Sequence, residues 1–377
     1  MKISICIFYF FFFFLTIFSF GQWKVSAAVQ QINSFGLPAH QMLSQVFTWQ
    51  SNFYVGTKTI GLTLPYNATC TLWRFNSKGT NTGSLDLIHV TGSRSFQSTC
   101  EILTYACSSN STVTLVISSD SFNTLVEIDL PTFSIVALGQ SFIAAYPTLI
   151  AIESQSNLIA YTKAYSASLY KLAFPGNPLP SSQPILQFPL QAVYTAASAS
   201  STYFIGVGTT DILSHKGSAQ VLFNQSLASG NYSTMSGVSP RAVITHDGTI
   251  VSTTEVAGPS GSTFTTYINI FPSSQPFPTT FGPMILAKDS LDKTAGILAS
   301  NTDIFVFMSS GGPSYLAHFT RSSSHPSSYD FAGGQNIGAA SLGYDMLSGG
   351  LLSTARTFAC ASYMTPSDFS QISFYSY

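Results

Sequence analysis

Short runs rich in β-branched and aromatic residues, separated by turn-forming residues, predict an all-β fold for this chain of 377 residues. Val, Ile, Thr, Tyr and Phe favour strands, whereas Gly, Pro, Asn, Asp and Ser interrupt them. No stretch shows a sustained apolar period of 3.6 residues with helix caps. The runs recur in groups of four, roughly every 40 to 50 residues, which is typical of propeller blades. We therefore predict a β-propeller, with seven four-stranded blades as the first choice and six or eight as alternatives.

Four consecutive groups between residues 102 and 281 carry this prediction. We expect strands at Ile102–Ala106, Thr112–Ile117, Leu125–Leu130 and Ser134–Leu138; at Thr148–Ile152, Leu158–Thr162, Ser168–Phe174 and Ile185–Phe188; at Ala192–Ala196, Tyr203–Val207, Asp211–Ser214 and Gln220–Phe223; and at Arg241–Thr245, Thr249–Val256, Phe264–Phe271 and Pro278–Phe281. Less regular copies at 41–90, 284–331 and 339–377 complete the ring.

Two segments resemble known propeller hairpins. Thr124–Leu138, with the core Leu-Val-Glu-Ile-Asp-Leu-Pro-Thr, resembles the hairpin between the third and fourth strands of YVTN-like or NHL-like propellers. Thr245–Val251, with Asp-Gly at its turn, is similar to the turn between their first and second strands. The resemblance implies a seven-bladed ring. It implies no particular activity, because one propeller architecture hosts many functions.

The C-terminal group has three clear runs, Gly349–Ser353, Phe358–Tyr363 and Ile372–Tyr375, after a poorly defined first one. The N-terminal part of the chain offers a spare apolar stretch at Trp23–Ile32. We expect this stretch to supply the closing strand, since a blade shared by both ends of the chain removes the open sheet edges of the ring. No linker, charge run or composition shift divides residues 22–377, which we interpret as one domain.

Residues 1–21 have the layout of a signal peptide, in which Lys2 is followed by an uncharged run from Ile3 to Phe20. Small residues permit cleavage after residue 21, or as late as residue 27. The expected product is secreted and has no transmembrane segment. The endolysosomal lumen and an uncleaved signal anchor are the alternatives, because an apolar run of this length can just span a bilayer.

Charged residues make up only 8% of the chain, against about 25% in ordinary soluble proteins. We expect hydroxyls, amides and attached glycans to keep the protein in solution. Four Asn-x-Ser/Thr triplets are candidate glycosylation sites, at Asn67, Asn110, Asn224 and Asn231. The net charge is −1 and the basic residues do not cluster, which argues against nucleic acid and anionic membranes as partners.

Removal of the signal peptide leaves four cysteines, Cys70, Cys100, Cys107 and Cys360, and we expect two disulfides. If Cys100 and Cys107 share one strand, roughly 23 Å separates them, too far for a bond. The remaining pairings are Cys70–Cys100 with Cys107–Cys360, or the crossed alternative. We prefer the first, because Cys70 and Cys100 fall at the same end of adjacent blades. No C-x-x-C pair or suitably spaced His supports zinc.

Acidic residues offer two candidate sites, each with a structural alternative that we prefer. Glu127 and Asp129 share a strand face and could form an acid/base or cation-binding pair, or else a solvated outer face. Asp289, Asp292 and Asp303 could supply oxygen ligands to calcium, or else form a turn with local hydrogen bonds. Nucleophile motifs such as G-x-S-x-G and H-E-x-x-H are missing from the sequence.

Histidines and aromatic residues are the other candidate binding groups. We interpret the scattered histidines, each taken singly, as structural or exposed. Exposed aromatic rings can stack on sugars or contact proteins, but we expect most of them to fill the space between blades. The residues considered are His40, His215, His246, His318 and His325, and Trp49, Phe53, Tyr54, Trp73, Tyr203 and Tyr267.

These observations favour an extracellular binding protein that recognises a glycan or a secreted or cell-surface protein through loops on one face of the ring. This hypothesis requires no catalytic residue and no cofactor. The first alternative is a propeller hydrolase or lactonase-like enzyme with a divalent cation such as Ca²⁺ in the central channel, held by acids such as Asp129, Glu153 or Asp247. The second is a structural matrix or cell-surface component. Metal binding and oligomeric state are left open.

Overall fold

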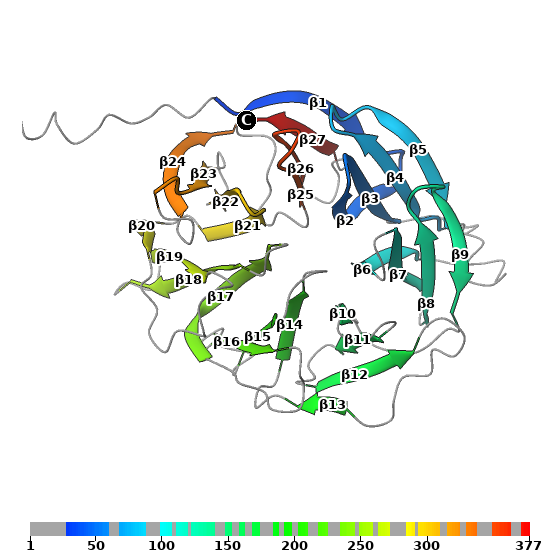
Figure 1. Cartoon of the computed structure of the whole chain (residues 1–377), viewed down its shortest axis with the longest axis horizontal. Helices are drawn as coiled ribbons and strands as arrows, with labels where there is room; N and C mark the ends of the chain where they lie inside the picture. Colours follow the sequence, from blue (N-terminus) through cyan, green and yellow to red (C-terminus); the bar gives the residue numbers. More distant parts are fainter. Residues whose placement is uncertain are drawn as a thin grey trace, which may run out of the picture.

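A computed structural model shows strands arranged in a ring around a central axis (Figure 1). The structure describes residues 28–59, 68–87, 99–107, 111–119, 122–139, 148–152, 158–162, 168–173, 184–187, 192–197, 203–209, 218–224, 234–245, 249–258, 263–271, 284–290, 293–309, 315–324, 329–337, 349–362 and 371–377. For some of these residues, including every one between 148 and 242, only the backbone is described. The predicted signal peptide lies outside these residues.

The described strands form consecutive antiparallel groups of four, as in the blades of a β-propeller, and β17 belongs to two of these groups. From the centre outward they are β2 (Gln41–Trp49), β3 (Asn52–Thr59), β4 (Thr71–Asn76) and β5 (Asn81–Asp86); β6 (Glu101–Cys107), β7 (Thr112–Ser119), β8 (Phe122–Asp129) and β9 (Ser134–Leu138); β10 (Thr148–Ile152), β11 (Leu158–Thr162), β12 (Ser168–Ala173) and β13 (Pro184–Gln187); β14 (Ala192–Ala197), β15 (Tyr203–Thr209), β16 (Ser218–Asn224) and the start of β17 (Thr234–Ile244); the rest of β17, β18 (Ile250–Ala257), β19 (Phe264–Phe271) and β20 (Met284–Ser290); β21 (Lys293–Ala299), β22 (Asp303–Ser309), β23 (Tyr315–Arg321) and β24 (Tyr329–Asn336); and β25 (Gly349–Leu352), β26 (Thr357–Ser362), β27 (Gln371–Ser376) and β1 (Gln30–Gly36).

The strand β17 belongs to two blades. Its first residues pair with β16, and Val238–Ile244 pair with β18. The outer strand of one blade therefore continues directly into the inner strand of the next. The sequence prediction differs from the structure in this blade and in the next one. The runs Asp211–Ser214 and Pro278–Phe281 lie outside the described residues, and the fourth strands of those two blades are the start of β17 and β20.

The ring is closed by the N-terminal strand, as predicted. β1 pairs with β27 in antiparallel register from Gln30↔Ser376 to Gly36↔Gln371. The Gln335 side chain of the neighbouring blade clamps the backbone just before β1, because its Nε2 donates to the Val29 carbonyl (2.9 Å) and its Oε1 accepts from the Val29 N–H (3.0 Å). The closing strand lies at 30–36 rather than at the apolar 23–32, and its side chains are mostly exposed.

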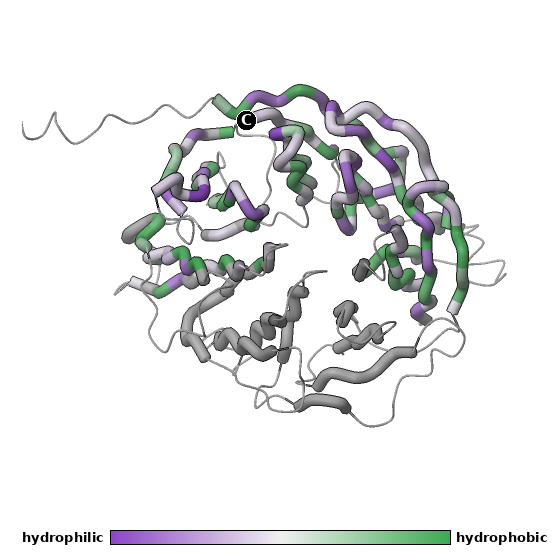
Figure 2. The backbone as a smooth tube through the Cα atoms, in the orientation of Figure 1, coloured by the Kyte–Doolittle hydropathy of each residue, from purple (hydrophilic) through white to green (hydrophobic). Residues whose placement is uncertain are grey.

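The core consists of apolar layers between adjacent blades. One layer joins the blade β2–β5 to the blade β6–β9 and includes stacked rings of Phe47 and Tyr54, with centroids 5.1 Å apart. Others join β21–β24 to β17–β20 and to β25–β27. Apolar colour also appears on the outer strand β9 (Figure 2), where Val136 and Leu138 are more than half exposed.

The alternating strand directions give the ring two ends. The last residues of β3 and β5 and the first residues of β4 and β6 lie at one end, which we call the disulfide end because a bridge between Cys70 and Cys100 lies there. The connections from β2 to β3 and from β4 to β5 lie at the opposite end.

The expected bridge between Cys107 and Cys360 is not formed. Cys360 is a free thiol on β26, buried among Leu298, Phe305 and Phe307 of the preceding blade. It therefore faces away from the blade β2–β5, and Cys107 ends the strand β6 on the far side of that blade. Apolar burial raises the pKa of the Cys360 thiol.

Candidate functional site

The candidate site lies at the disulfide end, between the blades β2–β5 and β6–β9. Cys70 directly precedes β4 and Cys100 directly precedes β6, and both are buried. Their sulfur atoms are 2.01 Å apart and their Cα atoms 5.4 Å apart. The Cys70 carbonyl accepts from the Leu87 N–H (3.0 Å), and the Cys100 carbonyl accepts from the Thr59 N–H (2.8 Å). The bridge and the bond between Thr59 and Cys100 tie the two blades together at this end of the ring.

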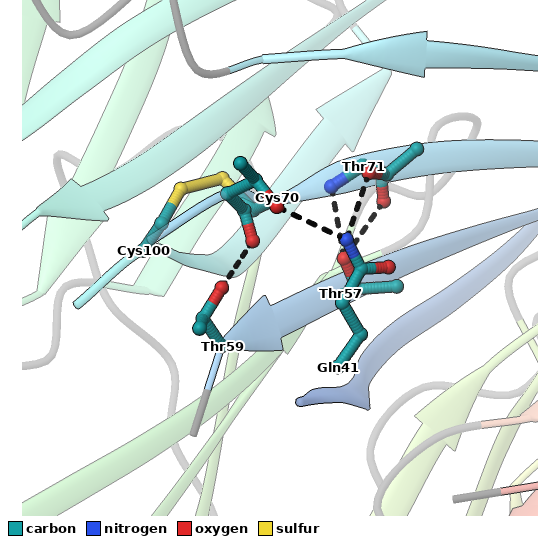
Figure 3. The surroundings of a disulfide bond; sticks show 7 residues. Gln41, Thr57, Thr59, Cys70, Thr71 and Cys100 are labelled. Carbon is teal, nitrogen blue, oxygen red and sulfur yellow. Dashed lines mark hydrogen bonds between the residues drawn. A yellow bond between two sulfur atoms is a disulfide. The ribbon is translucent and has the colours of Figure 1, made fainter. Parts of the chain in front are cut away.

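A network of hydroxyls and one amide lies beside the disulfide (Figure 3). The Thr57 Oγ1 accepts from the Thr71 N–H (2.8 Å) and lies 3.2 Å from the Thr71 carbonyl. The Gln41 Nε2 donates to the hydroxyls of Thr69 (3.3 Å) and Thr71 (3.2 Å), and the Thr59 hydroxyl donates to the Thr69 carbonyl. Gln41 begins the innermost strand β2, so the network reaches from the third strand of the blade to the central axis.

An ion pair continues this network into the next blade. Lys58 and Glu101 are the residue pair through which β3 and β6 bond, and the Lys58 Nζ lies 3.7 Å from the Glu101 Oε1. The two side chains are 25% and 34% exposed, so the pair is worth at most about 1 kcal/mol. Deeper in the ring, the Gln45 Nε2 donates to the Leu103 carbonyl (2.7 Å) and joins the two inner strands.

The polar groups at this end of the ring can form hydrogen bonds, and together they carry no net charge. Amide and hydroxyl groups both donate and accept, and the Gln41 Oε1 has no hydrogen-bond partner among the described residues. The ion pair adds one donor and one acceptor of opposite charge. Thr57 and Thr71 are buried, so their hydroxyls support the site from within. The partly exposed residues, Gln41, Thr69, Lys58 and Glu101, form a set that suits a polar ligand or a polar protein surface. It contains no nucleophile with an activating base.

A second polar cluster lies at the opposite end, between β21–β24 and the C-terminal blade. The His318 Nε2 lies 3.0 Å from the Asp303 Oδ1, and Asp303 Oδ2 accepts from the hydroxyls of Thr302 (2.6 Å) and Tyr377 (3.3 Å). The His318 ring stacks on Phe305 with centroids 4.3 Å apart. Burial alone would raise the pKa of Asp303, but its hydrogen bonds with His318, Thr302 and Tyr377 hold that pKa below the usual value.

These contacts give the cluster a structural role, because they fasten two neighbouring blades to each other. Burial and the nearby Asp303 carboxylate together raise the pKa of the Tyr377 hydroxyl, so Tyr377 stays a neutral donor. Both residues of the His318–Asp303 pair are nearly buried. Because Tyr377 follows β27 while Asp303 begins β22, the cluster ties the end of the C-terminal blade to its neighbour.

The acidic pair on β8 does not form a site. The Asp129 Oδ2 accepts from the Thr132 N–H (2.9 Å) and hydroxyl (2.5 Å), and the two hydrogen bonds lower the pKa of Asp129. The carboxylate therefore fastens the turn of the β8–β9 hairpin, which is the hairpin that the sequence predicted. Glu127 is partly buried two residues earlier on the same face.

Two of the three aspartates considered as calcium ligands lie far apart along their strands, and residue 292 lies outside the described residues. Asp289 is near the end of β20, whereas Asp303 begins β22, so the length of β21 separates the two, about 20 Å at 3.3 Å per residue. In the described part of the chain, no group of three or more His, Cys, Asp or Glu could hold a metal ion.

The aromatic candidates mostly fill space between blades, as predicted. Phe53 and Tyr54 are fully buried, and Trp49 and Trp73 pack against the interblade layers. Tyr267 is partly buried, and the Tyr203 side chain is not among those described. Of the histidines, His318 is the buried residue above and His40 is exposed in the turn before β2. Residues 215, 246 and 325, and the glycosylation candidates 67, 110 and 231, lie outside the described residues; Asn224 ends β16.

Sequence reasoning missed the threonine network and the Asp303–His318–Tyr377 cluster. The network had a weak signal, since Thr57, Thr59, Thr69 and Thr71 alternate along two neighbouring runs and so share faces. The cluster had none, because 15 and 74 residues separate its members from Asp303.

The comparisons with known proteins agree with the fold. No protein family and no curated protein matches the sequence. Among solved structures, a hydrazine synthase from Kuenenia stuttgartiensis has a TM-score of 0.56 at 9% identity and covers 85% of this chain and 92% of its own. The Dos1 propeller has a TM-score of 0.52 at 11% identity and covers 94% and 96%.

A third similar structure is the β-propeller domain of the Trilobed protease from Pyrococcus furiosus, with a TM-score of 0.54 at 10% identity over 90% of this chain and 94% of that one. That domain is described as having an open velcro topology, whereas here β1 pairs with β27. At such identities the likeness shows the fold alone. The chain is a β-propeller, and the comparisons do not single out the YVTN-like or NHL-like type.

Proposed function

We propose that this propeller is an extracellular binding protein that recognises a glycan or a protein partner at its disulfide end. The observation that carries the proposal is the partly exposed polar group of Gln41, Thr69, Lys58 and Glu101, which lies beside the Cys70–Cys100 bridge and is held from within by the buried Thr57 and Thr71. A rigid site loses less conformational entropy on binding than a mobile one. Sugar hydroxyls are matched by such donors and acceptors.

Secretion is part of the proposal and is supported by the sequence. A signal-peptide layout at residues 1–21 and four candidate glycosylation sites accompany a bridge of the kind that persists in oxidising compartments. Expression in eukaryotic cells tests this part. The protein should appear in the medium with residues 1–21, or up to 27, removed, and a glycosidase should lower its mass.

Binding is tested with the purified secreted protein on an array of glycans and against extracellular proteins. Replacing Gln41 by Leu and, separately, Lys58 and Glu101 together by Ala should weaken binding at least tenfold. The matched control is Asp330→Asn, an exposed substitution on β24, which should leave binding unchanged. Equal binding by all variants would place recognition elsewhere on the ring.

A metal-dependent hydrolase is the second candidate function and a structural matrix component the third. Asp129, one of the acids that the hydrolase would need, fastens a hairpin turn, and residues 153 and 247 lie outside the described residues. Calorimetric titration with Ca²⁺ is the direct check on the hydrolase. Stoichiometric binding together with ester or lactone hydrolysis would favour it over the binding protein.

A further inference from the structure

A polar layer lies between the blades β17–β20 and β21–β24, near the disulfide end. Thr253 and Glu255 are two apart on β18 and therefore share a face. Thr266 on β19 is the direct cross-strand partner of Glu255 and lies on the same face. Across the gap, the Thr294 N–H on β21 donates to the Glu255 Oε1 (2.6 Å). We call these four residues the polar seam.

The polar seam is closed to bulk solvent. Thr253, Glu255 and Thr266 have no exposed surface and Thr294 is 5% exposed. The hydroxyl oxygens of Thr253, Thr266 and Thr294 have no hydrogen-bond partner among the described residues. A buried hydroxyl without a partner costs about 1–3 kcal/mol, so three of them in one layer require an explanation.

We propose that the polar seam is a binding site for ordered water, which bridges the hydroxyls of Thr253, Thr266 and Thr294 next to the Glu255 carboxylate. A buried water molecule typically makes about three hydrogen bonds to protein groups that would otherwise lack partners. Three hydroxyls that each donate and accept, beside an acceptor carboxylate, provide such a set.

The proposal is tested by the direction in which Tm changes when a hydroxyl of the polar seam is replaced by a methyl group. An unpartnered hydroxyl is better replaced by a methyl group, whereas a water-bonded hydroxyl is not. Thr266→Val should therefore lower Tm by about 1–3 °C, while Thr266→Ser, which keeps the hydroxyl, should recover at least half of that loss. Thr57→Val is the matched control for a buried hydroxyl with known protein partners and should also lower Tm.

A Tm for Thr266→Val that equals or exceeds that of the parent protein would overturn the proposal. So would a cation at the site, which would appear as a Tm of the parent that changes between Na⁺, K⁺ and Ca²⁺ salts at equal ionic strength but not in Thr266→Val. In a high-resolution crystal structure, water density should lie about 2.7–3.2 Å from the Thr266 and Thr294 hydroxyls. Hydrophobic contact in place of that density would contradict the proposal independently of stability.

Discussion

Two interblade layers of this ring are held together by different means. Between β2–β5 and β6–β9, the layer is apolar, contains the Phe47–Tyr54 stack and ends in the Cys70–Cys100 bridge. Between β17–β20 and β21–β24, an apolar part around Val251 and Ile268 gives way to the polar seam. The first layer combines apolar burial with a covalent tie, and the second combines apolar burial with the hydrogen bond from Thr294 to Glu255. The same blade architecture thus tolerates both chemistries.

The largest effect should follow from opening the apolar layer. Phe47 is 3% exposed and its ring stacks on both Tyr54 and Tyr105. Phe47→Ala should lower the free energy of unfolding by about 3–5 kcal/mol. Denaturant unfolding measures the loss. Val136→Ala, at an exposed position of the adjacent blade, should stay within about 0.5 kcal/mol of the parent, and an equal loss in both variants would show that the layer has no special weight.

Removing the covalent tie should have the next largest effect. The bridge closes a segment of sequence separation 30, so the double substitution Cys70→Ala and Cys100→Ala should cost on the order of 3–4 kcal/mol by the chain-entropy estimate. Hydrogen exchange should become faster in β4 and β6 and stay unchanged in β18 and β19. Faster exchange across both layers would mean that the two regions do not open independently.

A pH-dependent loss of stability is expected on the other side of the blade β21–β24, where Asp303 contacts His318 and Tyr377. The folded pKa of Asp303 is lower than its unfolded value, so its ionised form stabilises the fold above the unfolded pKa, and this stability is lost as the pH falls through the folded pKa. The difference in Tm between the parent and Asp303→Asn should therefore shrink between pH 6 and pH 3. A difference that is constant over this range would show that ionisation of Asp303 plays no part.

The smallest effect belongs to the β8–β9 turn. Thr132→Ala removes the hydroxyl that donates to Asp129 and should move the pKa of Asp129 back toward its usual value. Because the hydrogen bonds between Thr132 and Asp129 lie at the surface, Tm should change little. An NMR titration of the Asp129 carboxyl in both proteins measures the shift, and an unchanged pKa would assign the lowering to another group.

The sequence predicted the parts of the fold that local pattern controls. Period-two runs located β6 to β9 and β10 to β13 within a few residues. The poorly defined first run of the last group, together with a spare N-terminal stretch, predicted closure by the N-terminus. The sequence prediction failed where one strand serves two blades. Gly237 and Pro240 lie at the change of partner, where the register with β18 shifts, but the prediction did not use them as a signal.

The functional groups were harder to predict than the strands. The Cys70–Cys100 bridge followed from strand direction, but the free Cys360 did not, because the face on which a strand residue packs depends on the neighbouring blade. The partners of Asp303, Glu255 and Gln41 are set by contacts across blades or strands. Such contacts leave no period in the sequence.

Closure by β1 has a consequence for synthesis of the chain. Because Gln30 pairs with Ser376, the first strand waits for the last to emerge, roughly 17–70 s at about 5–20 residues per second. Over this interval β1 is an unpaired edge of the kind that promotes aggregation. Its residues Gln30, Gln31, Asn33 and Ser34 are polar and remain exposed even in the finished ring. A strand that must wait unpaired for so long is thereby a poor template for other chains.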